Sequence, residues 1–215
     1  MTEAPHKVED RIAQMTLSVS PDALRQMVLD LPLLPSELRR FELLQEAAID
    51  NHTLANRSGG RDTIESLTEA GRLDGYHMSF AVEQGSSTLA EEPADLLEVS
   101  TSVHLFEKPD DVRGWIENSF IKRLRDSVGH EDQQGQRITG VELLSPSGFH
   151  ASCGGLLILQ DVPGGELATT VVEFELGRIL GVATAVAKVD LSYLNLVNQI
   201  GLELERQIVR VVLGG

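Results

Sequence analysis

Cysteine is almost absent from this chain: its 215 residues contain one, Cys153. An internal disulfide is therefore excluded, and the count argues against a metal site built on cysteines. Cys153 stands among small residues with no basic neighbour, so we expect a buried and unreactive thiol. A chain of this length buries enough apolar surface to fold without a disulfide or a structural metal.

Basic residues are also scarce. The chain has 18 lysines and arginines against 33 acidic residues, which gives a formal net charge of −15. Nucleic acids and anionic lipid surfaces attract concentrated positive charge and are repelled by this average surface. The sequence therefore predicts no nucleic-acid partner.

Long hydrophobic runs are missing as well. No stretch approaches the ~20 apolar residues of a membrane span, and the polar residues 1–10 precede no apolar signal-peptide core. We expect no membrane span and, for the chain as written, a cytoplasmic location. A truncated N-terminus would instead fit an extracytoplasmic location.

Recognisable catalytic and metal-binding motifs are the last absence. The glycine pairs match neither a P-loop nor a dinucleotide fingerprint, and no Gly-x-Ser-x-Gly occurs. The six histidines include no pair at the short spacing that a helix or turn would fix. We predict no metal and no cofactor, and we expect His77 and His104 to be exposed on two strands. Glu173 and Glu175 lie on one side of a strand and are expected to face water.

Hydrophobic alternation, by contrast, is plentiful. It predicts strands over 74–83, from Leu97, and over 141–144, 156–162, 169–176 and 179–189. Gly177-Arg178 has the length and composition of a hairpin turn. The hairpin 171–189 is nearly all apolar, so the sheet there is expected to be covered on both faces or to pair with a partner. The stretch 38–48 fits either a helix or a strand.

Helical periodicity predicts a helix over 108–129, which contains Trp115, and a long amphipathic helix that ends near Leu213. Strand runs separated by single helices favour an α+β fold. We predict an antiparallel sheet of about six strands, with helices packed on its face and a long C-terminal amphipathic helix closing it. Residues 1–30 are predicted as an N-terminal extension with a short helix, and residues 31–215 as a single domain.

One segment carries a resemblance. Gly71-Arg72-Leu73-Asp74-Gly75-Tyr76 joins a helix to a strand, and the chain then continues through Val103-His104-Leu105-Phe106 to the helix with Trp115. This arrangement resembles a family of poorly characterised bacterial proteins with a PsbP-like fold, many of them secreted or lipid-anchored. The resemblance covers about residues 30–213. It implies an antiparallel sheet flanked by helices and a binding or scaffolding role. The family brings no catalytic residues with it.

These observations favour a non-enzymatic binding or protein-interaction domain, whose partner is a protein or a small apolar ligand held between sheet and helix. One alternative is a small-molecule enzyme of hydrolase or cyclase type, with His77, His104 and Tyr76 converging in a pocket. A second alternative is a homo-oligomeric structural module. The candidate ligand-binding residues are Arg72, Tyr76, His77, His104 and Trp115.

Overall fold

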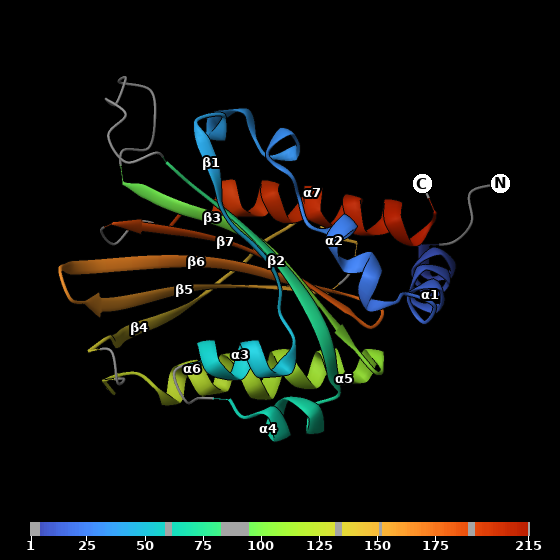
Figure 1. Cartoon of the computed structure of the whole chain (residues 1–215), viewed down its shortest axis with the longest axis horizontal. Helices are drawn as coiled ribbons and strands as arrows, with labels where there is room; N and C mark the ends of the chain where they lie inside the picture. The colour runs from blue at the N-terminus through green and yellow to red at the C-terminus, as the bar shows by residue number, and fades with distance from the viewer. Residues whose placement is uncertain are drawn as a thin grey trace.

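The computed structural model describes residues 5–58, 62–82, 95–131, 135–150, 152–188 and 192–214, and their side chains except those of residues 5–10, 118–120 and 123. Its centre is a seven-stranded antiparallel sheet in the order β1-β2-β3-β7-β6-β5-β4 (Figure 1). The strands are β1 (Phe41–Ala48), β2 (Arg72–Val82), β3 (Leu96–Phe106), β4 (Arg137–Leu144), β5 (Cys153–Val162), β6 (Gly165–Leu176) and β7 (Ile179–Lys188).

The sheet consists of two meanders, β1–β2–β3 and β4–β5–β6–β7, joined where β3 pairs with β7. The predicted α+β class, the antiparallel sheet and the closing C-terminal helix are confirmed. The strand beyond the expected six is β1, from the stretch whose pattern was ambiguous. β1 lies at the sheet edge, where Leu43 and Leu44 are 53% and 59% exposed. Such a strand has no buried alternation to reveal it.

Helices cover both faces of the sheet, as expected for the apolar β6–β7 hairpin (Figure 1). The first face carries α1 (Pro5–Thr16), α2 (Leu24–Met27) and α7 (Leu194–Val212). The second face carries α3 (Asn51–Arg57), α4 (Ile64–Glu69) and the segment 109–126. That segment was predicted as one helix. It is divided into α5 (Pro109–Gly114), a π-helical turn η4 (Trp115–Ile121) and α6 (Lys122–Asp126). Short 3₁₀ turns η1 (Pro21–Ala23), η2 (Leu31–Leu33) and η3 (Ser36–Leu38) lie between α1 and β1.

The main core lies between the first face and α7. The buried ring of Phe174 belongs to this core, and the partly buried ring of Phe149 stacks on it with a centroid distance of 5.2 Å. Each ring lies against a glycine. A Cβ on Gly181 of β7 would approach the Phe174 ring to 2.3 Å, and a Cβ on Gly201 of α7 would approach the Phe149 ring to 2.9 Å. Both glycines therefore make room for the rings, although glycine weakens a helix or strand interior.

The N-terminal segment belongs to this same core. Val19, Leu24, Met27 and Leu29 are buried in it beside residues of β2, β3 and α7. The described part of the predicted extension therefore packs into the domain that follows. In the described ranges, no helix is long and apolar enough to cross a membrane.

Arg178 fastens α1 to the sheet. It stands in the predicted two-residue turn between β6 and β7, which the structure confirms through the pair Leu176 and Ile179. Its guanidinium donates to the backbone carbonyls of Thr16 at 2.8 Å and Val19 at 2.5 Å, and to that of Phe106 at 3.2 Å. A cation at the carbonyl end of a helix also interacts favourably with the negative end of the helix dipole.

Replacing Arg178 with methionine is expected to detach α1 and to cost about 2–3 kcal/mol of unfolding free energy, because several partly buried carbonyls lose a charged donor. Hydrogen exchange followed by mass spectrometry should show the amides of residues 5–16 losing protection first. Arg210→Met, on the exposed side of α7, serves as the matched control. If α1 keeps its protection in Arg178→Met, the guanidinium is not its anchor.

Candidate functional site

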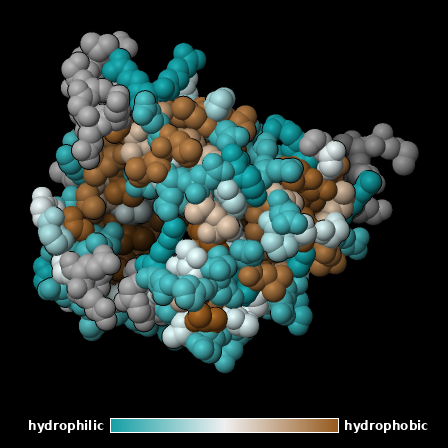
Figure 2. Space-filling view, in the orientation of Figure 1, coloured by the Kyte–Doolittle hydropathy of each residue, from teal (hydrophilic) through white to brown (hydrophobic). Residues whose placement is uncertain are grey.

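Solvent reaches the middle of the sheet on the second face. β7 is the central strand, and its first-face residues Ala183 and Ala185 are fully buried. Its second-face residues Val182, Thr184 and Val186 are partly exposed. Figure 2 shows a hollow on this side of the molecule, between the sheet and α3, with hydrophobic residues in its walls. We call this region of the second face the groove.

Polar side chains lie on the second face of β2, β3 and β7. Ser100 of β3 and Thr184 of β7 are cross-strand neighbours, and their hydroxyl oxygens lie 2.7 Å apart. Ser102 of β3 is hydrogen-bonded to Nδ1 of His77 on β2 at 2.9 Å. These hydroxyls were not among the predicted site residues. The signal for them was the run Ser100, Ser102, His104, whose spacing of two places all three on one face of a strand.

Arg72 lies at the end of this polar row and is 1% exposed. Its Nε–H donates to Nδ1 of His104 at 3.3 Å, and its terminal nitrogens donate to Asn51 Oδ1 at 2.7 Å and to the Ile49 carbonyl at 2.6 Å. The guanidinium lies over Gly75, where a Cβ would approach Arg72 Nη2 to 2.6 Å. Arg72 thus joins β2 and β3 to the entry of α3. Burial lowers its pKa to about 10, against the opposing effect of Asp74 and Asp50.

The two histidines are neutral. Burial lowers the pKa of His77 to about 4, assisted by the charge of Arg57. Burial also holds the pKa of His104 well below its ordinary value. The charge of Arg72 and the proximity of His77 lower it further. Because Arg72 donates to Nδ1 of His104, the proton of that ring lies on Nε2. The expectation of exposed histidines was wrong: both are partly buried, since helices cover the second face.

Tyr76 lies on the opposite face of the sheet from the two histidines. It packs against the main core, and its hydroxyl donates to Glu46 Oε1 at 2.8 Å. The separation of Tyr76 from Arg72 has a cause in β2, where the register shifts between Arg72 and Asp74. A one-residue bulge reverses the face of every following side chain. The trio His77, His104 and Tyr76 therefore does not converge.

Trp115 is on the second face, at the start of η4. Its ring packs against Phe106 with a centroid distance of 5.9 Å. Together with Phe106, Val112 and Leu180 it forms a small apolar cluster, which also contacts Val182 on the groove floor. Of the five candidate residues, Arg72, His77, His104 and Trp115 thus share the second face, and Tyr76 does not.

The expectation that Glu173 and Glu175 face water was wrong. The segment with α5 and η4 covers this part of the second face. Glu175 accepts from Nε of Arg113 on α5 at 3.2 Å. Glu173 is 2% exposed, and its Oε1 has no hydrogen-bond partner among the described side chains. Burial raises the pKa of Glu173 to about 8. Near neutral pH this side chain is therefore mainly a protonated carboxyl group.

Cys153 agrees with the expectation of an unreactive thiol. It is partly buried, and burial together with the nearby Glu205 raises its pKa. Glu205 accepts hydrogen bonds from the backbone N–H of His150 at 3.0 Å, and its other oxygen lies 3.2 Å from the ring nitrogen Nδ1 of His150. Within the described ranges, no three histidine, cysteine or acidic side chains are grouped to hold a metal ion.

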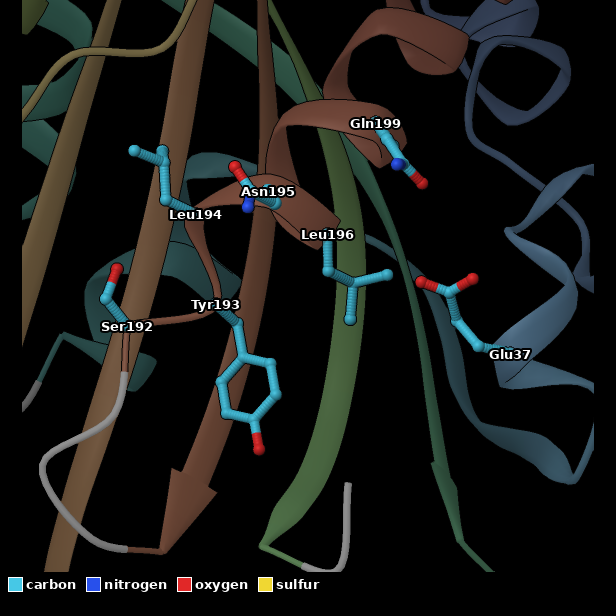
Figure 3. Close-up of a pocket in the computed structure, with 7 residues that line it drawn as sticks. All are labelled: Glu37, Ser192, Tyr193, Leu194, Asn195, Leu196 and Gln199. Carbon is cyan, nitrogen blue, oxygen red and sulfur yellow. The ribbon is translucent and has the colours of Figure 1, made fainter. Parts of the chain in front are cut away.

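A separate cavity of about 340 Å³ lies on the first face, at the start of α7 (Figure 3). The Glu37 carboxylate faces α7 across the cavity. Its negative charge disfavours the binding of an anion at the start of this helix. The backbone N–H of Tyr193 is already bonded to Thr170 Oγ1 at 3.0 Å. None of the candidate residues lies here. The residues lining the cavity are Glu37, Ser192, Tyr193, Leu194, Asn195, Leu196 and Gln199.

Comparison with known proteins gives a likeness of fold. No protein-family model matches the chain, and no curated protein matches it. Among solved structures, the chain is similar to the extracellular domain of PknH from Mycobacterium tuberculosis, with a TM-score of 0.56 and 11% sequence identity. The match covers 88% of this chain and 96% of that domain. At this identity the likeness supports the architecture and assigns no function.

Proposed function

We propose that the chain is a non-enzymatic binding domain, whose ligand occupies the groove on the second face. The observation that carries this proposal is the burial of the central strand: Val182, Thr184 and Val186 are partly exposed, whereas Ala183 and Ala185 between them are fully buried. A partly open, mixed apolar and polar surface at the centre of a sheet is typical of a ligand site. The resemblance to PsbP-like proteins also implies a binding role and stays a prediction.

The enzyme alternative has less support. Its proposed trio is divided between the two faces of the sheet, and the neutral histidines are engaged with Ser102 and Arg72. The homo-oligomer alternative would assemble through the sheet edge or the C-terminal helix. On β1 the register shifts between Leu43 and Gln45, and an irregular edge of this kind discourages pairing with a second chain.

The neutral dye Nile red tests the groove. We expect the wild-type protein to bind it and Val186→Phe to bind it at least about fivefold more weakly, because the phenyl ring occupies space above the floor of the groove. Leu44→Phe, on the exposed edge strand β1, adds the same ring elsewhere and should leave binding unchanged. Fluorescence titration measures both. Equal binding by Val186→Phe and the wild type would place the dye, and the proposed site, outside the groove.

A further inference from the structure

Two buried side-chain atoms of the described residues lack a hydrogen-bond partner, and both lie on the second face. They are Ser79 Oγ on β2 and Glu173 Oε1 on β6. Buried polar groups are nearly always paired, and an unpaired one needs a specific explanation. Their location on the groove face suggests that a bound molecule supplies a missing partner. Glu173 is the more informative of the two, because a carboxyl group is more costly to bury unpaired than a hydroxyl.

The surroundings of Glu173 are apolar. Its cross-strand neighbours are Val182 on β7 and Gly154 on β5, and Val171 precedes it on the same face. Burial by the described residues is the cause of its raised pKa. Arg113 on α5 is paired with Glu175, two residues further along β6. Among the described side chains, the carboxyl group therefore has no counter-ion of its own.

Glu173 lies between two partly exposed positions of the second face. Its Oε1 lies 3.6 Å from the position that a Cβ on Gly154 would take. Oε1 thus borders the space that the absent side chain leaves free. Gly154 and Val182, on its two sides, are both partly exposed. A small donor group on a ligand could reach the carboxyl group by this side.

The π-helical turn η4 lies above the same position. Trp115 and Ile116, at its start, belong to the apolar cluster that contacts Val182. Ile121, at its end, packs on the cluster that contains Leu156 and Val171. The two clusters border Glu173, because Val182 is its cross-strand neighbour on β7 and Val171 precedes it on the same face of β6. π-helical turns are rare and are found frequently at functional sites.

We propose that the groove binds an apolar amine, whose ammonium group donates to the Glu173 carboxylate beside Gly154. This inference rests on the proposed function and names the class of ligand. An ammonium group supplies hydrogen-bond donors, and its positive charge lowers the cost of ionising Glu173, which gives up its proton to solvent when the amine binds. Charge-assisted hydrogen bonds of this kind are the stronger ones. An alcohol supplies a donor without the charge. An anion is opposed by Glu173 and by the net charge of −15. The apolar body of the ligand would lie over Val182 and Val186, which are partly exposed on β7.

The test compares n-octylamine with n-octanol, which share one chain and differ in the head group. Calorimetric titrations at pH 7 use the full chain as wild type, Glu173→Gln and Glu166→Gln. Glu166 is exposed on the same strand and provides the matched control. Trp115 is the single tryptophan, so its fluorescence reports binding near Val182. Glutamine has the shape of the protonated side chain, so Glu173→Gln is expected to fold.

We expect wild type and Glu166→Gln to bind the amine at least about tenfold more tightly than the alcohol, and Glu173→Gln to lose that preference. If the amine and the alcohol bind wild type equally, the amine assignment is wrong and the groove remains a binding site. A preference for the amine that survives in Glu173→Gln also overturns the assignment. If neither compound binds, the proposed function fails with it.

Discussion

Glu173→Gln is expected to be more stable than the wild-type protein at pH 9, by on the order of 4 kcal/mol of unfolding free energy, and equally stable at pH 5. Glu173 is 2% exposed and has an unpartnered oxygen, and burial raises its pKa from 4.5 to about 8. At pH 5 the folded protein keeps the carboxyl group protonated. At pH 9 it must either bury a carboxylate or unfold locally.

The direction follows from proton linkage. Because the pKa of Glu173 is higher in the folded than in the unfolded chain, its stabilising contribution is complete below pH 4.5 and is lost as the pH rises through about 8. His77 has the opposite dependence: its pKa of about 4 is lower than its ordinary 6.5, so its contribution is lost as the pH falls. Between pH 6.5 and 8 the unfolding free energy therefore changes with the ionisation of Glu173 and not with that of His77.

Urea unfolding followed by circular dichroism at pH 5, 7 and 9 measures the difference between the two proteins. Glu166→Gln, exposed on the same strand, is expected to keep the wild-type pH profile. A difference between wild type and Glu173→Gln that does not change with pH would mean that the carboxyl group is not held protonated by burial.

Arg72→Met is expected to lower the unfolding free energy by about 3 kcal/mol or more. The substitution removes the guanidinium that Ile49, Asn51 and His104 share. A buried acceptor left without its partner costs about 1–3 kcal/mol, and three acceptors are affected. The methionine side chain fills part of the space and limits the loss. Arg72→Lys keeps the charge but cannot reach all three acceptors, so we expect it to recover only part of the stability.

Thermal and urea unfolding of the Arg72 variants provide the measurement, and hydrogen exchange locates the effect. The amides of α3 and of the end of β1 should lose protection before those of β5 and β6. Arg39→Met, at an exposed position, should leave the unfolding midpoint where it is in the wild type. A wild-type midpoint in Arg72→Met would show that β1, β2 and β3 are held together without this residue.

Most of the fold could be predicted because most strands have one buried face. Met78 and Phe80 alternate on β2, and the turn at Gly177-Arg178 has the glycine that its positive φ of 57° requires. β1 stayed ambiguous between helix and strand because it lies at the edge, and α1 was not predicted because it is polar and held by Arg178, a residue distant in sequence. The π-helical turn within the predicted helix 108–129 left no periodic signal.

The site was harder to predict than the fold. The motif Gly-Arg-x-x-Gly-Tyr singled out Arg72 and Tyr76, and spacing alone places both on one face of a strand. The register shift after Arg72 divides them, and hydrophobic alternation cannot reveal a bulge of one residue. Glu173 was expected to face water because acidic residues are almost never buried. Its burial depends on η4 and α5, which approach from a segment that precedes β6 by two strands.

The join between β3 and β7 has a consequence for synthesis on the ribosome. The N-terminal meander ends at Phe106, but the strand that completes its edge, β7, begins only at Ile179. Until then β3, with Val99 and Val103, lacks β7 at its open edge and α7 over its buried face. An uncovered strand edge promotes aggregation. The domain thus has no early half that can close by itself. Translation arrested before residue 179 should leave a protease-sensitive chain, and resistance at that stage would contradict this order of assembly.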